Sequence, residues 1–327
     1  MTDSFIYSFN SVMPIVLLVL FGMFLKKIGF LKEDYCAIAD KLVFNFALPL
    51  ESVRSISGTD FKVIFSGKNL ELIAFFTVGI VAAFVAVCLG VRLFIKENPR
   101  RSVFTQGAVR GNFAIFALPL AGNMFGEEGR IAAAMILPVV IVMYNILAVV
   151  AFTVFAPEDG ERQSVSAVVW RILKSIAKNP LILGIVVALA FSFIKTETGV
   201  TIPAFMMGAI EDVAALAVPL SLISIGVNFK PEKLKSGIGL AVWCMVIKNI
   251  ALPAIALTVA ALMGMRGIPL TMILVSFGGP TAVSSYIMAK NMHGDAELAS
   301  KILLLTTVCS LVTVFVFIFI LKQMALI

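Results

Sequence analysis

Residues 111–126 read GNFAIFALPLAGNMFG, and Arg110 stands directly before them. The surrounding chain is apolar enough to lie in lipid, yet this stretch contains two asparagines, one proline and three glycines. A segment that only crossed a bilayer would avoid these residues, because glycine and proline interrupt helices and polar side chains are costly in hydrocarbon. The stretch therefore predicts an interrupted helix with a function at membrane depth.

The composition places the whole chain in a membrane. Hydrophobic residues make up 60% of the sequence and the mean hydropathy is +1.04, whereas soluble domains are about 45–50% apolar. The apolar runs are continuous and near the ~20 residues of a spanning helix, so they predict an all-α membrane protein and not a β-barrel. Ten spans are predicted, at residues 6–25, 36–54, 70–95, 102–124, 130–155, 180–195, 204–228, 237–263, 268–290 and 299–321.

The basic residues predict how the chain is oriented. If the N-terminus lies outside the cell, sixteen lysines and arginines fall in inside loops and seven in outside loops or the tail. This bias obeys the positive-inside rule. It predicts a multi-pass protein of the cell membrane whose loop between spans five and six is cytoplasmic. It also explains the net charge of +7 without a nucleic-acid partner.

Cofactor and enzyme chemistry receive no support from the sequence. The four cysteines are scattered, there is a single histidine, and no HExxH, GxSxG or P-loop motif occurs. We therefore expect no metal, no cofactor and no enzymatic activity. Residues 165–178 place Val165 and Val169 on one helical face and Arg171 mostly opposite, which predicts either an amphipathic helix on the membrane surface or an extension of span six.

An internal repeat relates the opening stretch to residues 279–294, GPTAVSSYIMAKNMHG. Six of sixteen positions are identical at a constant offset of 168, and ALPL at 47–50 matches AVPL at 217–220 at an offset of 170. Each half then holds five spans, so the second half enters the membrane from the opposite side, as in the inverted repeats of secondary transporters. The predicted organisation is a first repeat at 1–157, a cytoplasmic linker at 158–179 and a second repeat at 180–327.

The repeat predicts two helix breaks at corresponding depths. Pro119 is expected to kink or break span four, and Pro280, with Gly278 and Gly279, span nine. Broken backbone at membrane depth is tolerated only where protein covers it or a cavity adjoins it. Amides freed at half-helix N-termini favour an anion, so the two breaks together predict a substrate site.

Five motifs in order resemble the auxin efflux carrier family, with bacterial members of the malonate and malate permease kind. They are LVFNFALPL at 42–50, the opening stretch, AVPLSLISIGVNF at 217–229, KNIALPAIAL at 248–257 and PTAVSSYIMAKNMHGDAELASKI at 280–302. The resemblance covers the whole chain. It implies a fold like that of plant auxin carriers and bile-acid symporters, with broken helices four and nine crossing.

Further expectations follow from this resemblance. Spans one, two, six and seven would form a scaffold, and a homodimer would form through this scaffold. Spans three to five and eight to ten would form a moving transport domain. The family often has glycines between the asparagine and the proline of span four, where this chain has Ala114 and Ala117. Because alanine favours helix by about 1 kcal/mol per site, we expect a short unwound stretch here.

The candidate substrate ligands include two cations far from helix ends. Lys248 lies about 12 residues, or about 18 Å, into span eight, and Arg110 lies about 12 Å deep. Intramembrane cations beside helix breaks favour an anion, although Lys248 could instead be structural and Arg110 could reach the surface. The full predicted set is Asn45, Arg110, Asn112, Phe113, Pro119, Lys248, Gly279, Pro280, Thr281 and Ser284, with Glu51, Glu211 and Asp212 as candidates for ion or proton coupling.

The leading hypothesis is a secondary carrier of small organic anions, such as malonate, malate or an auxin-like acid, that uses elevator-type alternating access. A coupled proton or sodium ion is a further expected partner. Two alternatives remain open at this stage: a sodium-coupled symporter of bile-acid type, and a transporter-like membrane sensor without flux.

Overall fold

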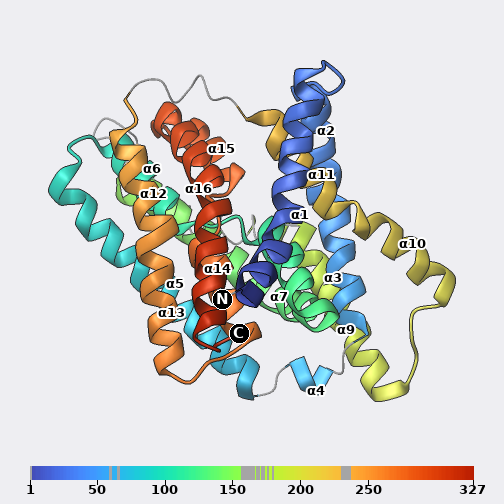
Figure 1. Cartoon of the computed structure of the whole chain (residues 1–327). Helices are drawn as coiled ribbons and strands as arrows, with labels where there is room; N and C mark the ends of the chain where they lie inside the picture. Colours follow the sequence, from blue (N-terminus) through green and yellow to red (C-terminus); the bar gives the residue numbers. More distant parts are fainter. Residues whose placement is uncertain are drawn as a thin grey trace.

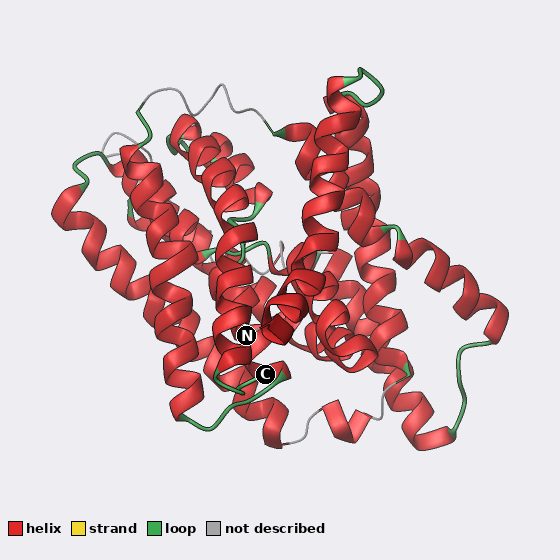
Figure 2. Ribbon diagram, in the orientation of Figure 1, coloured by secondary structure: helices red, strands yellow, loops and turns green. Residues whose placement is uncertain are grey.

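The structure is a computed structural model that describes residues 2–58, 61–64, 67–155, 180–229 and 237–327, together with five isolated positions between 166 and 178. The predicted amphipathic stretch at 165–178 and most of the linker lie outside the described residues. Helices account for nearly all the rest, and no β-strand occurs in these ranges (Figure 2). The all-α prediction is therefore confirmed for the described part of the chain.

The helices differ widely in length because several spans are interrupted. In chain order they are α1 (Thr2–Lys27), α2 (Glu33–Leu42), the π-helix η1 (Val43–Ala47), α3 (Leu48–Ser57), α4 (Phe61–Ile64), α5 (Gly67–Phe94), α6 (Asn98–Val109), α7 (Phe113–Val154), α9 (Pro180–Thr198), α10 (Ala204–Ala215), α11 (Ala217–Asn228), α12 (Gly239–Val246), the π-helix η3 (Ile247–Ala251), α13 (Leu252–Leu262), α14 (Ile268–Gly278), α15 (Val283–Asn291) and α16 (Ala296–Gln323).

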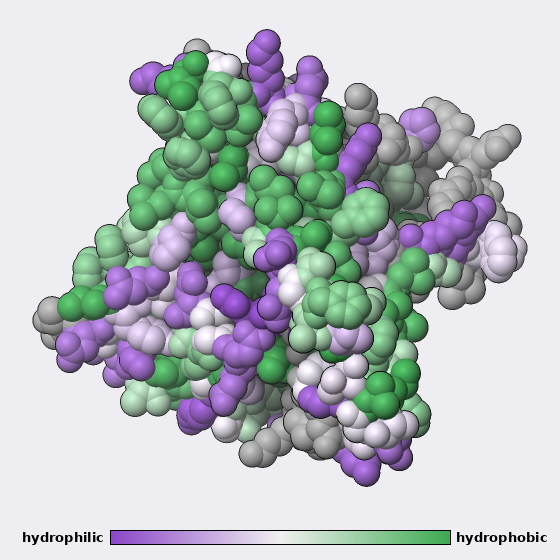
Figure 3. All heavy atoms as spheres, turned by 90° about the vertical axis from the view of Figure 1, so that its right-hand side faces the viewer, coloured by the Kyte–Doolittle hydropathy of each residue, from purple (hydrophilic) through white to green (hydrophobic). Residues whose placement is uncertain are grey.

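Among the described residues, six helical runs are long and apolar enough to cross a membrane. They are Asp3–Lys27, Leu70–Phe94, Ile115–Val154, Ala204–Asn228, Gly239–Leu262 and Ala296–Gln323, and Ile268–Gly278 is a shorter apolar helix. The outward-facing side chains agree with a lipid environment, because large hydrophobic residues such as Leu93, Phe205 and Leu262 are more than three-quarters exposed. Figure 3 shows hydrophobic residues over broad areas of the face that carries α10.

The long helix α7 contains a sharp reversal at Gly126. Its φ of 60° and ψ of −136° lie in a region that side chains rarely adopt, so glycine is needed there. Just beyond the reversal, a Cβ on Gly129 would lie 2.2 Å from the carbonyl oxygen of Ala121, so the two arms approach closely. Residues 113–125 and 127–154 are thus two consecutive helical arms. The first covers only the second half of predicted span four, whose first half is α6, and the second lies where span five was predicted.

The helices gather in two groups (Figure 1). On one side, α1 packs along α11, and α3 packs against α9 and α10. On the other, α5, α6 and α12 to α16 pack against one another and against α7. The groups meet where α1 contacts α16, and where α3 and α11 contact α7.

Two glycines allow α1 and α11 to touch backbone to backbone. A Cβ on Gly226 would lie 2.0 Å from the carbonyl oxygen of Val19, and one on Gly22 would lie 2.1 Å from that of Ile223. Small residues at such contacts are how membrane helices pack closely, since hydrophobic burial contributes little between helices in lipid.

Gly226→Ala is therefore expected to separate α1 from α11 and to lower the free energy of unfolding by about 1–3 kcal/mol, the usual cost of overpacking. Thermal unfolding in detergent would measure the loss. The matched control is Gly208→Ala in α10, where no atom lies within 4 Å of the added Cβ. Equal melting temperatures for the two variants would contradict the close contact.

Candidate functional site

The two predicted breaks meet in space. Residues 110–112 separate α6 from α7, and residues 279–282 separate α14 from α15. Gly111 and Thr281 form an isolated antiparallel bridge. The Asn112 amide donates to the Pro280 carbonyl at 2.7 Å, and the Ala282 amide donates to the Arg110 carbonyl at 3.4 Å. Two interrupted helices therefore cross at their breaks, and we call this place the crossing.

Local sequence explains the position of each break. In α14 the Ser276 carbonyl would accept from residue 280, but Pro280 has no amide hydrogen, so this carbonyl is free for another donor. At the other break, a Cβ on Gly111 would lie 2.7 Å from the Ser276 carbonyl oxygen, so only glycine fits.

The prediction that span four breaks at Pro119 was wrong in position. Pro119 lies within α7, and the break precedes that helix at residues 110–112. One missing amide is tolerated inside a membrane helix when neighbouring groups satisfy the freed carbonyl. The tight backbone contact at Gly111 fixes the interruption instead. The expectation of a short unwound stretch is confirmed, because Ala114 and Ala117 are already helical.

Lys248 closes the C-terminal side of the crossing. Its side chain is fully buried in the π-helical turn η3, and its Nζ donates to the carbonyl oxygens of Val109 and Ser276, each at 3.1 Å. Val109 is the last residue of α6, and Ser276 lies in the last turn of α14. The ammonium thus bridges two helix C-termini, whose unpaired carbonyls carry partial negative charge.

Further polar groups satisfy the neighbouring carbonyls. The Tyr144 hydroxyl donates to the Ser276 carbonyl at 2.9 Å, and the Asn249 amide donates to the Gly278 carbonyl at 3.0 Å. The Thr281 hydroxyl donates to the Gly107 carbonyl at 2.7 Å, while the Thr306 hydroxyl accepts from the Thr281 amide at 3.1 Å. These bonds tie α6, α7, α14, α16 and η3 together.

The N-terminal side of the crossing is arranged differently. The first amides of α7 and α15 have no carbonyl one turn before them, as at every helix start. Asn112 is the N-cap of α7 by position, but its side chain makes no hydrogen bond within the described residues. Ser284, the second residue of α15, likewise makes no side-chain hydrogen bond there. The hydroxyl of Ser285 is buried and has no hydrogen-bond partner there. Two helix starts with unused polar side chains therefore lie together.

Arg110 is buried beside these helix starts. One guanidinium nitrogen donates to the Asn145 side-chain oxygen at 2.8 Å, and another lies 2.6 Å from the sulfur of Met288 on α15. Neither partner is charged, and Arg110 forms no ion pair with the described acidic residues. A buried guanidinium without a carboxylate has the charge and the donors to bind an anion.

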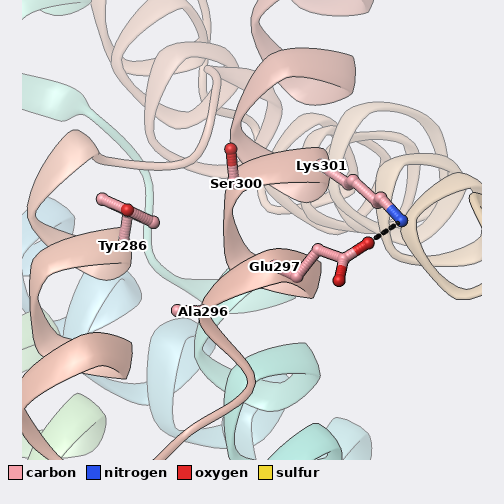
Figure 4. A pocket seen from close by; sticks show the side chains of 5 residues that line it. All are labelled: Tyr286, Ala296, Glu297, Ser300 and Lys301. Atoms are coloured by element: carbon pink, nitrogen blue, oxygen red, sulfur yellow. Dashed lines mark hydrogen bonds and ion pairs between the residues drawn. The ribbon is translucent and has the colours of Figure 1, made fainter. Parts of the chain in front are cut away.

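A cavity of about 380 Å³ lies against α15 and the start of α16, and none of the residues that line it belongs to the crossing. It is lined by Tyr286, Ala296, Glu297, Ser300 and Lys301. Figure 4 shows Tyr286 projecting from α15, and Glu297 and Lys301 from α16, where their side chains form an ion pair of 2.6 Å. The cavity is large enough to admit a small solute.

The remaining predicted residues divide into two sets. Phe113, Gly279, Pro280 and Thr281 lie buried at the crossing. Asn45 is exposed on η1 and donates to the carbonyl of Lys41 on its own helix. Glu51 forms a two-pronged ion pair with Arg54, with both bonds at 2.8 Å. Glu211 and Asp212 are exposed on α10, so the structure does not bring these four residues to the crossing.

Sequence reasoning missed Gln106, Tyr144, Asn145, Ser276 and Asn249. Gln106 donates to the Ser285 carbonyl at 2.8 Å, and the others bind Lys248, Arg110 or the carbonyls around them. A signal was present, since each is a polar residue inside a predicted span, where such residues mark function or helix contacts. Their spacing in the sequence alone did not show that all five would lie around Lys248, Arg110 and the carbonyls of the crossing.

Comparison with known families agrees with the apolar helices. The profile of the family described as membrane transport protein matches residues 7–318. This chain belongs to that family, the auxin efflux carriers. It is therefore a multi-pass membrane transporter, as the motifs predicted.

Some relatives extend along most of the transporter and others along about half of it. An uncharacterized transporter of Methanocaldococcus jannaschii is 28% identical over 309 residues, which cover 93% of this chain and 95% of the relative. A Rhizobium meliloti protein named "Putative malonate transporter" is 25% identical over 76% of this chain and 77% of its own length. An Oryza sativa protein named "Probable auxin efflux carrier component 5b" is 25% identical over 48% of this chain and 43% of its own.

Proposed function

We propose that this transporter carries small organic anions, with dicarboxylates such as malonate as the first class to test. The observation that carries the proposal is that the helix C-termini at the crossing have a bound cation, whereas the helix N-termini there have no bound carboxylate among the described residues. Lys248 compensates the helix C-termini, whereas the N-termini of α7 and α15 face unused donors and Arg110. Helix N-termini and an unpaired guanidinium favour a carboxylate. The similarity to the Rhizobium meliloti protein supports this choice.

The proposed mechanism is alternating access by an elevator-type motion, within a ten-span, inverted-repeat fold whose N-terminus faces outward. Helices α5 to α7 and α12 to α16 would move together against a scaffold of α1 to α3 and α9 to α11. The bonds of the crossing support this division, because each joins two helices of the first group. A homodimer through the scaffold stays a prediction.

Flux through proteoliposomes tests the proposal. Purified protein should move radiolabelled malonate, malate or a related dicarboxylate faster than empty vesicles do. Unlabelled acids and their neutral esters serve as competitors, and only the charged forms should compete. Saturable binding without any flux would overturn the transport proposal in favour of a sensor.

Asn112→Ala is expected to lower kcat/KM for the transported anion about tenfold, the effect of losing one hydrogen bond to a charged group. Initial uptake rates over a range of substrate concentrations would measure it. The comparison variant is Asn45→Ala, because sequence alone proposed both asparagines and the structure places Asn45 on an exposed face. A larger loss for Asn45→Ala than for Asn112→Ala would move the site away from the crossing.

A further inference from the structure

The Lys248 ammonium is compensated by backbone carbonyls and not by a carboxylate. Its ammonium is fully buried, yet it forms no ion pair with the described acidic residues. A buried ammonium without compensation would be strongly unfavourable. Compensation comes from the Val109 and Ser276 carbonyls, which belong to the C-terminal ends of two different helices.

The charge of these two ends matches one cation. A helix C-terminus carries about half a negative charge, so two converging ends approximate a single one. The Tyr144 hydroxyl also donates to the Ser276 carbonyl, and the centre of its ring lies 5.9 Å from the Lys248 ammonium nitrogen. Carbonyl and hydroxyl oxygens gathered in this way are ligands that hard cations prefer.

We infer that the Lys248 ammonium permanently occupies a monovalent-cation site formed by the interrupted ends of α6 and α14, so that transport needs no soluble sodium ion. Pro280 is part of this site, since it leaves the Ser276 carbonyl without a helical donor. Lys248 is thus a positioning residue that holds the two breaks together. The flux measurements that test this inference rest on the proposed anion transport, whereas the melting-temperature measurements do not.

Removing the side chain should expose the site. In Lys248→Ala the carbonyls are left with a space that sodium or methylammonium can enter. Without such a cation, anion flux should fall at least about tenfold, because removing one partner of a buried charge leaves the other uncompensated. Added sodium or methylammonium should restore most of the flux and raise the melting temperature, while choline, which is too large, should do neither.

Three variants separate charge from shape and from burial. Lys248→Met fills the space without a charge, and Lys248→Gln retains two N–H donors without a charge, so both should lose flux and neither should respond to cations. Lys301→Ala is the matched control, because it removes a buried lysine whose partner is the Glu297 carboxylate 2.6 Å away. Its melting temperature should not depend on which cation is present at equal ionic strength.

The wild-type protein should transport equally well in sodium, potassium and choline buffers. Strict sodium dependence of the wild type would overturn the inference, as would wild-type flux in Lys248→Gln. Absence of any cation effect on both flux and melting temperature in Lys248→Ala would also overturn it. If Lys248→Ala does not fold, Lys248→Gln decides, and lost flux at a near-native melting temperature supports the cation site. The melting-temperature results need no substrate, so they stand even if the proposed anion proves wrong.

Discussion

Arg110→Gln is expected to raise the KM for a dicarboxylate by between about tenfold and a hundredfold. A hydrogen bond to a charged group contributes about 1.5–3 kcal/mol, and each 1.4 kcal/mol is tenfold in affinity. The Lys248 ammonium is compensated by two backbone carbonyls at helix C-termini. The Arg110 guanidinium, by contrast, contacts only a side-chain amide and a thioether, so its charge is available to a bound anion. Uptake rates of a charged substrate and of its neutral monoester, measured side by side, would test this expectation.

The control for this variant is Arg101→Gln in α6, the helix that directly precedes Arg110. Arg101 donates to the carbonyl of Ile95 and to the side chain of Asn98, both within the adjacent turns. We expect its KM to stay near that of the wild type. Equal losses for the charged substrate and the monoester in Arg110→Gln would show that Arg110 shapes the site without binding the anion's charge.

Gly111→Ala is expected to abolish most transport and to lower the melting temperature. The added Cβ would lie 2.7 Å from the Ser276 carbonyl oxygen and 3.2 Å from the Lys248 ammonium. A backbone oxygen held by two donors cannot move aside, so the crossing itself must open. Overpacking of this kind costs about 1–3 kcal/mol of stability. Flux and thermal unfolding of the same preparation would measure both effects.

Gly90→Ala in α5 provides the comparison for Gly111→Ala. No atom lies within 4 Å of a Cβ at Gly90, and alanine favours helix over glycine, so this variant should be as stable as the wild type or more so. Wild-type flux in Gly111→Ala would mean that the breaks do not need their close contact.

The helical class and the interruption at Pro280 could be predicted from the sequence because both depend on local chemistry. Long apolar runs must form helices in lipid, where every backbone group needs a partner within the segment. The repeat placed residues 110–112 opposite residues 278–280, and the structure interrupts helices at 110–112 and 279–282. The shift from Pro119 to Gly111 was beyond this reasoning, since it depends on a backbone oxygen contributed by α14.

The candidate site was only partly predictable for a similar reason. Lys248 and Arg110 look alike in the sequence, as lone cations inside apolar spans. Their partners differ in space, two carbonyls for Lys248 and an amide and a thioether for Arg110. The sequence proposed both Asn45 and Asn112 as ligands, and it favoured Asn112 because that residue was expected beside a break; only Asn112 adjoins the crossing. Which residues meet depends on how distant helices cross, and residue spacing does not encode that.

Density for a bound anion tests the central claim most directly. An experimental map of the protein with its best-transported dicarboxylate should show the anion at the starts of α7 and α15, in contact with Asn112 and Arg110. A map with the anion bound only against the scaffold helices, and with an unoccupied crossing, would contradict the account.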